Sequence, residues 1–164
     1  MNRKGRVQKM IEKAYEAHVA GVLSNGFQGH IRYILQLPET VRKVHLRFTF
    51  DKREPECDQG RLRSDCRRAL LTNMPEEMIT EEMLDQLVKF PKGEINMTAS
   101  YQHAILGTAH RNELVKDVVI GPDEASEGFV PASFKGGAME ITLHCQNIVN
   151  EGTPYELLIE GSAR

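Results

Sequence analysis

The chain has 164 residues, of which 40% are hydrophobic and 27% charged, so it suits a single folded domain and is not globally disordered. Its net charge of −2 excludes a strongly basic surface of the kind that recruits nucleic acid or acidic lipid. No stretch approaches the ~20 apolar residues that cross a bilayer, and the basic N-terminus lacks the apolar run of a signal peptide. We therefore expect a cytoplasmic protein that binds neither nucleic acid nor a membrane.

The cysteines also favour the cytoplasm. Cys57, Cys66 and Cys145 are odd in number and form no Cys-x-x-Cys motif, which favours reduced thiols over disulfides.

The N-terminal segment, residues 1–13, is predicted to be a short helix or a tail. Val7, Met10 and Ile11 recur at helical spacing between basic residues. Residues 14–23 fit either a continuation of this helix or a strand, because Ala17 and Val19 also fit an alternating pattern.

Two strands are predicted next, over residues 31–37 and 44–50. Both segments alternate apolar and polar residues, and a Pro-Glu-Thr turn separates them. The pattern predicts two half-buried antiparallel strands that pair with each other through a short loop.

Residues 51–65 are polar and predicted to form a loop, and a helical insertion is assigned to residues 62–92. Asn73 with Glu76 fits a capping box, and Thr80 is a second N-cap candidate. An apolar stripe at helical spacing follows these caps and predicts one or two helices between about 74 and 90. It consists of Ile79, Met83, Leu84, Leu87 and Val88.

Alternating apolar residues return after residue 93. They predict strands within the segments 94–107, 113–121, 137–149 and 153–162, each separated from the next by glycine-containing turns. With the earlier segments this makes six or seven short strands and few helices. We therefore expect a mainly β, single domain over residues 1–164, folded as an antiparallel, jelly-roll-like β-sandwich with one helical insertion.

The C-terminal third resembles a known module. Residues 120–161 contain an acidic segment at Glu124, the step Gly128-Phe129-Val130-Pro131, the pair Gly136-Gly137, and the run Gly152-Thr153-Pro154-Tyr155-Glu156-Leu157. This succession is similar to the end of the β-sandwich domain that precedes the catalytic domain in CehA/McbA-type metallohydrolases of the PHP superfamily. Residues 30–54 also resemble that module's early strand pair. The resemblance covers about 14–54 and 100–161 and favours a strand for residues 14–23.

The resemblance implies an auxiliary module rather than a hydrolase. The chain would end where the catalytic domain of that family begins, and no two of its six histidines form the His-x-His pair that opens such a domain. No catalytic residue, metal ligand or cofactor is therefore carried over. The helical insertion at 62–92 departs from the family's pattern.

His103, His110 and Arg111 are a candidate ligand site. The two histidines and the arginine flank a glycine-containing segment, and Arg111 has the geometry to bind a carboxylate or phosphate through two hydrogen bonds. The alternative is that these are separate, solvated side chains.

The other histidines and the cysteines are weaker candidates. His18, His30 and His45 lie on successive predicted strands and could form a metal site, but all occupy the polar phase of the alternation. His144 and Cys145 are adjacent on one strand and point to opposite faces, with Cys145 inward.

The arginine-rich surroundings of Cys57 and Cys66 would lower a thiol pKa. Two incidental thiols on a charged loop are the simpler interpretation.

The helical insertion is the candidate partner site. Met78 and Met83 belong to a methionine-rich segment, and methionine is favoured at adaptable binding surfaces. Together with Leu87 they would contact a protein partner or a second copy. The alternative is that they cover one end of the sandwich.

The segment from 117 to 146 first suggests a loop that binds something, because it is acidic and rich in glycine. As part of the resemblance it is instead predicted to be structural, with Phe129 and Val130 buried.

We expect a non-catalytic binding or assembly module, bacterial or archaeal, that self-associates or docks to a separately encoded enzyme. A small-ligand or carbohydrate-binding sandwich is the second hypothesis, and a small metal- or thiol-dependent enzyme is the third.

Overall fold

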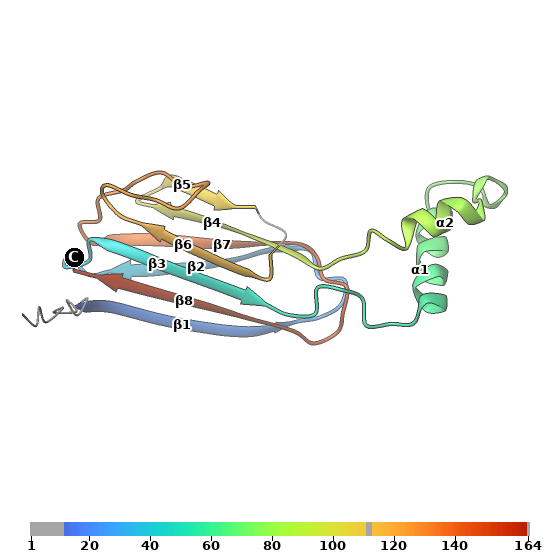
Figure 1. Cartoon of the computed structure of the whole chain (residues 1–164), viewed down its shortest axis with the longest axis horizontal. Helices are drawn as coiled ribbons and strands as arrows, with labels where there is room; N and C mark the ends of the chain where they lie inside the picture. The colour runs from blue at the N-terminus through green and yellow to red at the C-terminus, as the bar shows by residue number, and fades with distance from the viewer. Residues whose placement is uncertain (1–11, 111–112, 164) are drawn as a thin grey trace, which may run out of the picture.

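The computed structural model describes residues 12–110 and 113–163, and these form a mainly β protein with two four-stranded antiparallel sheets (Figure 1). Sheet A has the order β1 (Lys13–Leu23), β8 (Thr153–Ser162), β3 (Lys43–Phe50) and β6 (Val115–Ile120). Sheet B has the order β2 (Gly29–Leu37), β7 (Gly137–Asn147), β4 (Glu94–Tyr101) and β5 (Ala104–Ala109). We call the two sheets with their connecting loops the β body.

The two sheets share one hydrophobic core. Inward side chains alternate along every central strand, as the sequence predicts, and β7 contributes Met139, Ile141, Leu143 and Cys145, all at most 3% exposed. The hydroxyls of Tyr33 on sheet B and Tyr155 on sheet A lie 2.6 Å apart and join the sheets. Burial, followed by this hydrogen bond, raises the pKa of Tyr33.

The strand assignment of residues 14–23 is confirmed by β1. The predicted N-terminal helix or tail, residues 1–13, lies outside the described residues except for Glu12 and Lys13, and Lys13 begins β1. Among the described residues, no helix has both the length and the apolar character needed to cross a membrane.

The predicted pairing of residues 31–37 with 44–50 is wrong, although both strands exist. The first lies in β2 and pairs with β7, whereas the second lies in β3 and pairs with β6 and β8. The intervening loop crosses from sheet B to sheet A and buries Val41 completely. Alternation identifies the buried face of a strand but carries no information about its neighbour.

The described residues form eight strands rather than six or seven, because β4 and β5 form a hairpin within one predicted segment. Gln102 and His103 form its turn with φ angles of 46° and 69°. Two successive positive φ angles match the two-residue type I′ hairpin turn, which usually contains asparagine and glycine. Gln102 and His103 are neither asparagine nor glycine, so the sequence contains no hairpin signal at this turn.

The segment between β6 and β7 covers the edges of both sheets. Thr108 of β5 donates its N–H to Gly128 O at 3.1 Å, and Val130 donates to Leu106 O at 2.8 Å. Ser126 donates in the same way to Val119 O of β6, at 2.8 Å. This segment therefore has a structural role at two sheet edges that would otherwise be open.

The helices are α1 (Gln59–Leu71), the 3₁₀ turn η1 (Glu76–Met78) and α2 (Glu81–Leu87). Thr80 caps α2 as predicted, since its side chain accepts from Met83 N. The predicted Asn73 cap is wrong, because Asn73 follows α1 and donates to Ala69 O, and Pro75 precedes η1. The helical insertion also begins before residue 62, since Asp58 caps α1 by accepting from Arg61 N.

Candidate interaction site

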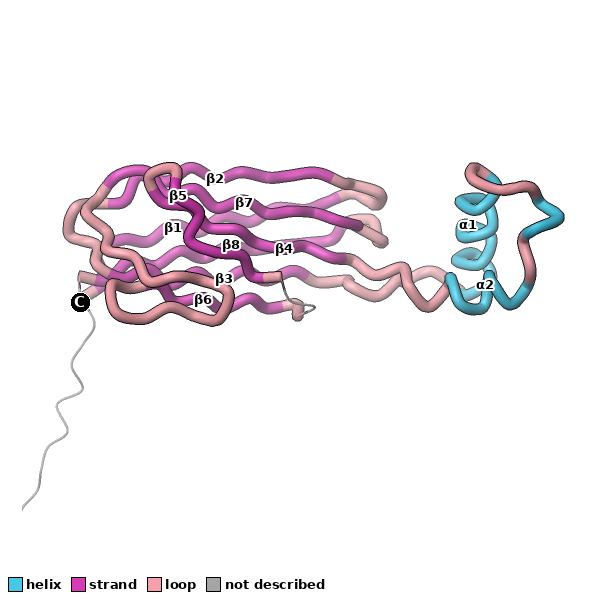
Figure 2. Tube along the Cα trace, turned by 90° about the horizontal axis from the view of Figure 1, so that it is seen from above, coloured by secondary structure: helices cyan, strands magenta, loops and turns pink. Residues whose placement is uncertain are grey.

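A helical protrusion, residues 54–92, extends beyond one end of the two sheets (Figures 1 and 2). It leaves the β body after β3 and returns at β4. The two connecting segments meet where Gly93 N donates to Arg53 O at 2.7 Å. The protrusion is therefore attached to the β body by two adjacent chain segments.

The two helices of the protrusion carry opposite charge. Helix α1 has four arginines and one aspartate, whereas residues 76–87 contain five acidic residues and no basic one. Arg63 bridges Glu81 and Asp85 at 2.5 Å each, and Arg67 bridges Glu81 at 2.9 Å. The Arg63 guanidinium lowers the pKa of the Glu81 carboxyl. Because these groups are exposed, the ion pairs orient the helices more than they stabilise them.

The core of the protrusion is small. Only Leu62, Cys66, Ile79 and Leu84 are buried in it, and this cluster is separate from the core of the β body. Partly buried neighbours extend the cluster, among them Leu70 and Leu87. So few buried side chains leave much of the apolar surface of the helices uncovered.

An apolar groove lies on the outside of this small core. It is a hollow of about 730 Å³, lined by Leu70, Thr80, Glu82, Met83, Gln86, Leu87 and Phe90. Phe90, which lines it, is 72% exposed, and Leu71 is 45% exposed at the end of α1. Clustered apolar exposure of this kind marks interaction surfaces in folded proteins.

The groove brings together two of the three predicted partner residues. Met83 and Leu87 both line it, from one face of α2. Met78, on η1, is 60% exposed and does not line the groove. Leu70 and Phe90 are the apolar groove residues that the sequence did not single out. Leu70 lies on a helix whose charged sequence resembles a loop.

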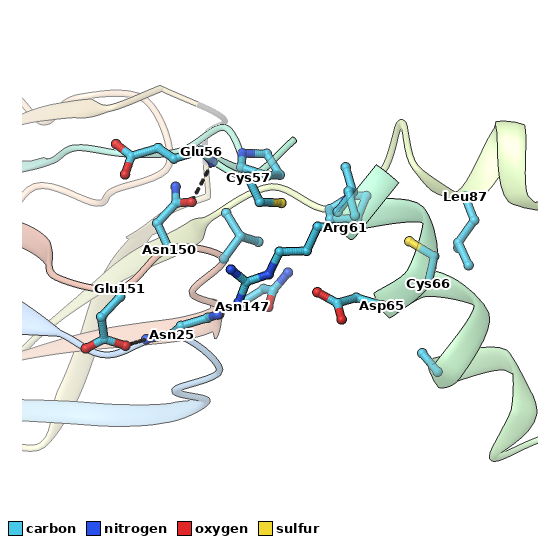
Figure 3. A pocket seen from close by; sticks show the side chains of 15 residues that line it. Asn25, Glu56, Cys57, Arg61, Asp65, Cys66, Leu87, Asn147, Asn150 and Glu151 are labelled. Carbon is cyan, nitrogen blue, oxygen red and sulfur yellow. Dashed lines mark hydrogen bonds between the residues drawn. The ribbon is translucent and has the colours of Figure 1, made fainter. Parts of the chain in front are cut away.

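The base of the protrusion is held by Asn150, which is 5% exposed (Figure 3). Its Nδ2 donates to Lys52 O and to Glu54 O at 2.6 Å each, and its Oδ1 accepts from Glu56 N at 2.7 Å. Lys52 itself has a φ angle of 56°, which a non-glycine residue rarely adopts. One side chain of the β body thus holds the segment that leads into α1.

A hollow of about 550 Å³ separates this base from α1 (Figure 3). Cys57 and Cys66 both line it, near Arg61 and Asp65. Burial, and then the Asp65 carboxylate and Cys57, raise the pKa of the Cys66 thiol, so its surroundings suppress the thiolate. Within residues 12–110 and 113–163, no three His, Cys, Asp or Glu side chains converge in a way that could hold a metal ion.

The structure does not gather the described members of the predicted ligand site. His103 lies in the β4–β5 turn and His110 follows the last residue of β5, so the six-residue strand of about 20 Å separates them. Arg111 lies outside the described residues. His103 instead lines a hollow on the outer face of sheet B, at about 470 Å³, together with His30 and His144.

The model of a family of unknown function, DUF6669, matches residues 11–162. No curated protein and no solved structure matches.

Proposed function

The chain belongs to the DUF6669 family, and we propose that it is a non-catalytic assembly module that self-associates through the apolar groove of its helical protrusion. The observation that carries the proposal is Phe90, a large apolar side chain that lines the apolar groove and is nevertheless 72% exposed. A monomer gains nothing from an apolar side chain held in water next to an unfilled apolar hollow.

A second copy of the chain is the occupant that fits the groove best. The groove and Phe90 lie on the same surface, so a two-fold axis beside them would insert each Phe90 into the groove of the other copy. Such an isologous contact uses one patch twice. Methionine at the rim, here Met83, adapts its shape to a partner's side chain.

The charges of the protrusion also favour a second copy. Basic α1 and acidic η1–α2 make a bipolar surface, and antiparallel placement of two bipolar surfaces sets each helix against one of opposite charge. Complementary charge directs the encounter and fixes its orientation more than it adds affinity.

The position of the protrusion leaves room for this contact. Both views show the helices beyond the end of the sheets, so two copies can meet through their protrusions without contact between their β bodies (Figures 1 and 2). The hold of Asn150 on the base keeps the groove in one orientation before binding, which lowers the entropy cost of association.

The β body would serve as the scaffold. We infer a jelly-roll β-sandwich, which is supported by the strand order β1-β8-β3-β6 beside β2-β7-β4-β5 and by the single core between the sheets. The likeness to the auxiliary domain of CehA/McbA-type hydrolases is part of the same proposal. The three free thiols support a cytoplasmic location.

Sedimentation velocity of the full chain between about 1 and 100 µM tests the proposal. We expect a concentration-dependent dimer whose dissociation constant rises more than tenfold in Phe90→Ser and in Met83→Ser, because central apolar contacts contribute ~2 kcal/mol or more. Ile34→Ser is the matched control, since Ile34 is 68% exposed on the β body, and it should dimerise as the parent chain does.

A chain that stays monomeric over this range would overturn self-association, as would a Phe90→Ser variant that dimerises normally. If a monomeric chain instead retains a separately encoded enzyme, and Phe90→Ser loses it, the groove serves that enzyme.

A further inference from the structure

Two histidines far apart in the sequence meet on the outer face of sheet B. His30 of β2 and His144 of β7 are direct cross-strand partners. Their Nδ1 atoms lie 3.0 Å apart, and their rings are nearly perpendicular, at 79°, with centroids 4.8 Å apart. Both side chains line the hollow of about 470 Å³ on this face, and neither lines the groove of the helical protrusion.

The second ring nitrogen of His144 is also engaged. Its Nε2 lies 2.8 Å from Thr98 Oγ1, which in turn lies 2.9 Å from Thr108 Oγ1. When the Nε2–H of His144 donates to Thr98, the lone pair of Nδ1 is left facing His30. A histidine whose outer nitrogen donates to a fixed acceptor is the usual arrangement for a metal ligand.

The spacing of the two Nδ1 atoms fits two ligands on one ion. Nitrogens 3.0 Å apart, each at the ~2.05 Å typical of metal–imidazole bonds, subtend an angle of ~94° at the metal. Neighbouring ligands in square-planar and octahedral complexes are about 90° apart, and these geometries are preferred by Cu²⁺ and Ni²⁺. A tetrahedral Zn²⁺ would require the nitrogens to separate by roughly a further 0.3 Å.

We propose that His30 and His144 bind a divalent late transition-metal ion, Ni²⁺ or Cu²⁺, through their Nδ1 atoms. The remaining positions on the ion face the hollow, where water or a polar small ligand would complete them. Binding requires the proton that His30 Nδ1 donates to His144 Nδ1 to leave for water, while His30 Nε2 takes up a proton from water in exchange, so no net proton is released. His144 keeps its own proton on the Nε2 that faces Thr98.

The surroundings of the pair tolerate the added charge. Arg32 lines the same hollow but is paired with Glu140 at 3.3 Å, so it does not present an uncompensated cation. Burial, and then His30, lower the pKa of His144, which favours the neutral form of its imidazole. A metal ion binds that neutral form. The site is independent of the dimer contact, so either proposal can fail alone.

Calorimetric titration of the full chain with NiCl₂ at pH 7.5 tests the site. Ni²⁺ is the probe because Cu²⁺ would also oxidise thiols. We expect one Ni²⁺ per chain, a loss of at least tenfold in affinity in His30→Gln and in His144→Gln, and a loss of about tenfold in Thr98→Val. The control His103→Gln, in the same hollow, and His18→Gln, on β1 of sheet A, should bind as the parent chain does.

A pH series adds a second readout. Affinity should fall as the pH is lowered, because protons compete with the metal ion for the imidazole nitrogens. Arg32, Glu140 and His103 are the other titratable groups that line the hollow, and the His103→Gln variant should show the same pH profile. Absence of Ni²⁺ binding, or unchanged binding in both His30→Gln and His144→Gln, would overturn the proposal.

Discussion

At the scale of single residues, the segment between β6 and β7 contains apolar side chains of very different burial. Phe134 is 1% exposed and packs edge-on against Tyr101, with ring centroids 5.0 Å apart. The Tyr101 hydroxyl donates to Gly136 O at 2.5 Å and accepts from Lys135 N at 3.0 Å. Phe129 is only half-buried, and the prediction that Val130 is buried is wrong, since it is 54% exposed.

This gradient predicts a graded loss of stability. Phe134→Ala should lower the free energy of unfolding by ~3–5 kcal/mol, as for a fully buried phenylalanine. Phe129→Ala should cost about half as much, because its ring is only partly removed from water. Val130→Ala is the control and should stay within ~0.5 kcal/mol of the parent chain.

Urea unfolding followed by circular dichroism measures all three variants. Equal losses for Phe129→Ala and Phe134→Ala would contradict this assignment of the core.

At the scale of elements, the connection from β3 to α1 depends on side-chain hydrogen bonds rather than on apolar packing. Asn150 makes three of them with the chain between residues 52 and 56, and Thr153 donates to Asn150 O at 3.1 Å. Buried amide groups are costly when they lose their partners, so this one side chain should decide how firmly the protrusion is held.

Asn150→Ala should therefore loosen the protrusion while the sheets stay intact. We expect faster amide hydrogen exchange in residues 52–71 and unchanged exchange in β3, β7 and β8, because the two cores are separate. Asn147→Ala is the matched control, since Asn147 makes only a weak bond, at 3.4 Å, to Lys92 O in the same region. Equal loosening in both variants would show that Asn150 has no special part in holding the base.

At the scale of the whole molecule, the protein divides into a β body with a large core and a helical protrusion with a small one. All strands of the β body contribute to one cluster of buried and partly buried residues, and none of the residues of the protrusion belongs to it. The ends of the protrusion also lie next to each other, at Arg53 and Gly93. The β body thus has the contacts it needs to fold without its insertion.

Replacing residues 54–92 by two glycines should consequently leave a folded, monomeric β body. We expect a cooperative thermal transition and a strand-type circular dichroism spectrum, with no dimer in sedimentation velocity at ~100 µM. Loss of cooperative unfolding would mean that the protrusion stabilises the body. A dimer of the shortened chain would place the self-association surface on the sheets.

Local patterns in the sequence were sufficient to predict most strands of the β body and their buried faces. Alternation predicted the inward faces of β4, β7 and β8, and the side chain of Thr80 was enough to locate the start of α2. Most of α1 lies within the predicted insertion at 62–92, but the sequence predicts helices only between about 74 and 90, because five of the 13 residues of α1 are charged and only Leu62 and Cys66 are buried. Of the residues that line the groove, Met83 and Leu87 could be predicted from the sequence, because they lie on the apolar stripe of an amphipathic helix.

What the sequence determined by itself was which side chains point inward, because the periods of strands and helices are properties of a few consecutive residues. Only the tertiary structure decided which strands are neighbours, since hydrogen bonds between strands form at any sequence separation and leave no local pattern. For this reason the sequence alone did not show that β2 and β3 lie in different sheets. For the same reason His30 meets His144 across 114 positions, and the groove of the protrusion combines Leu70 with Phe90.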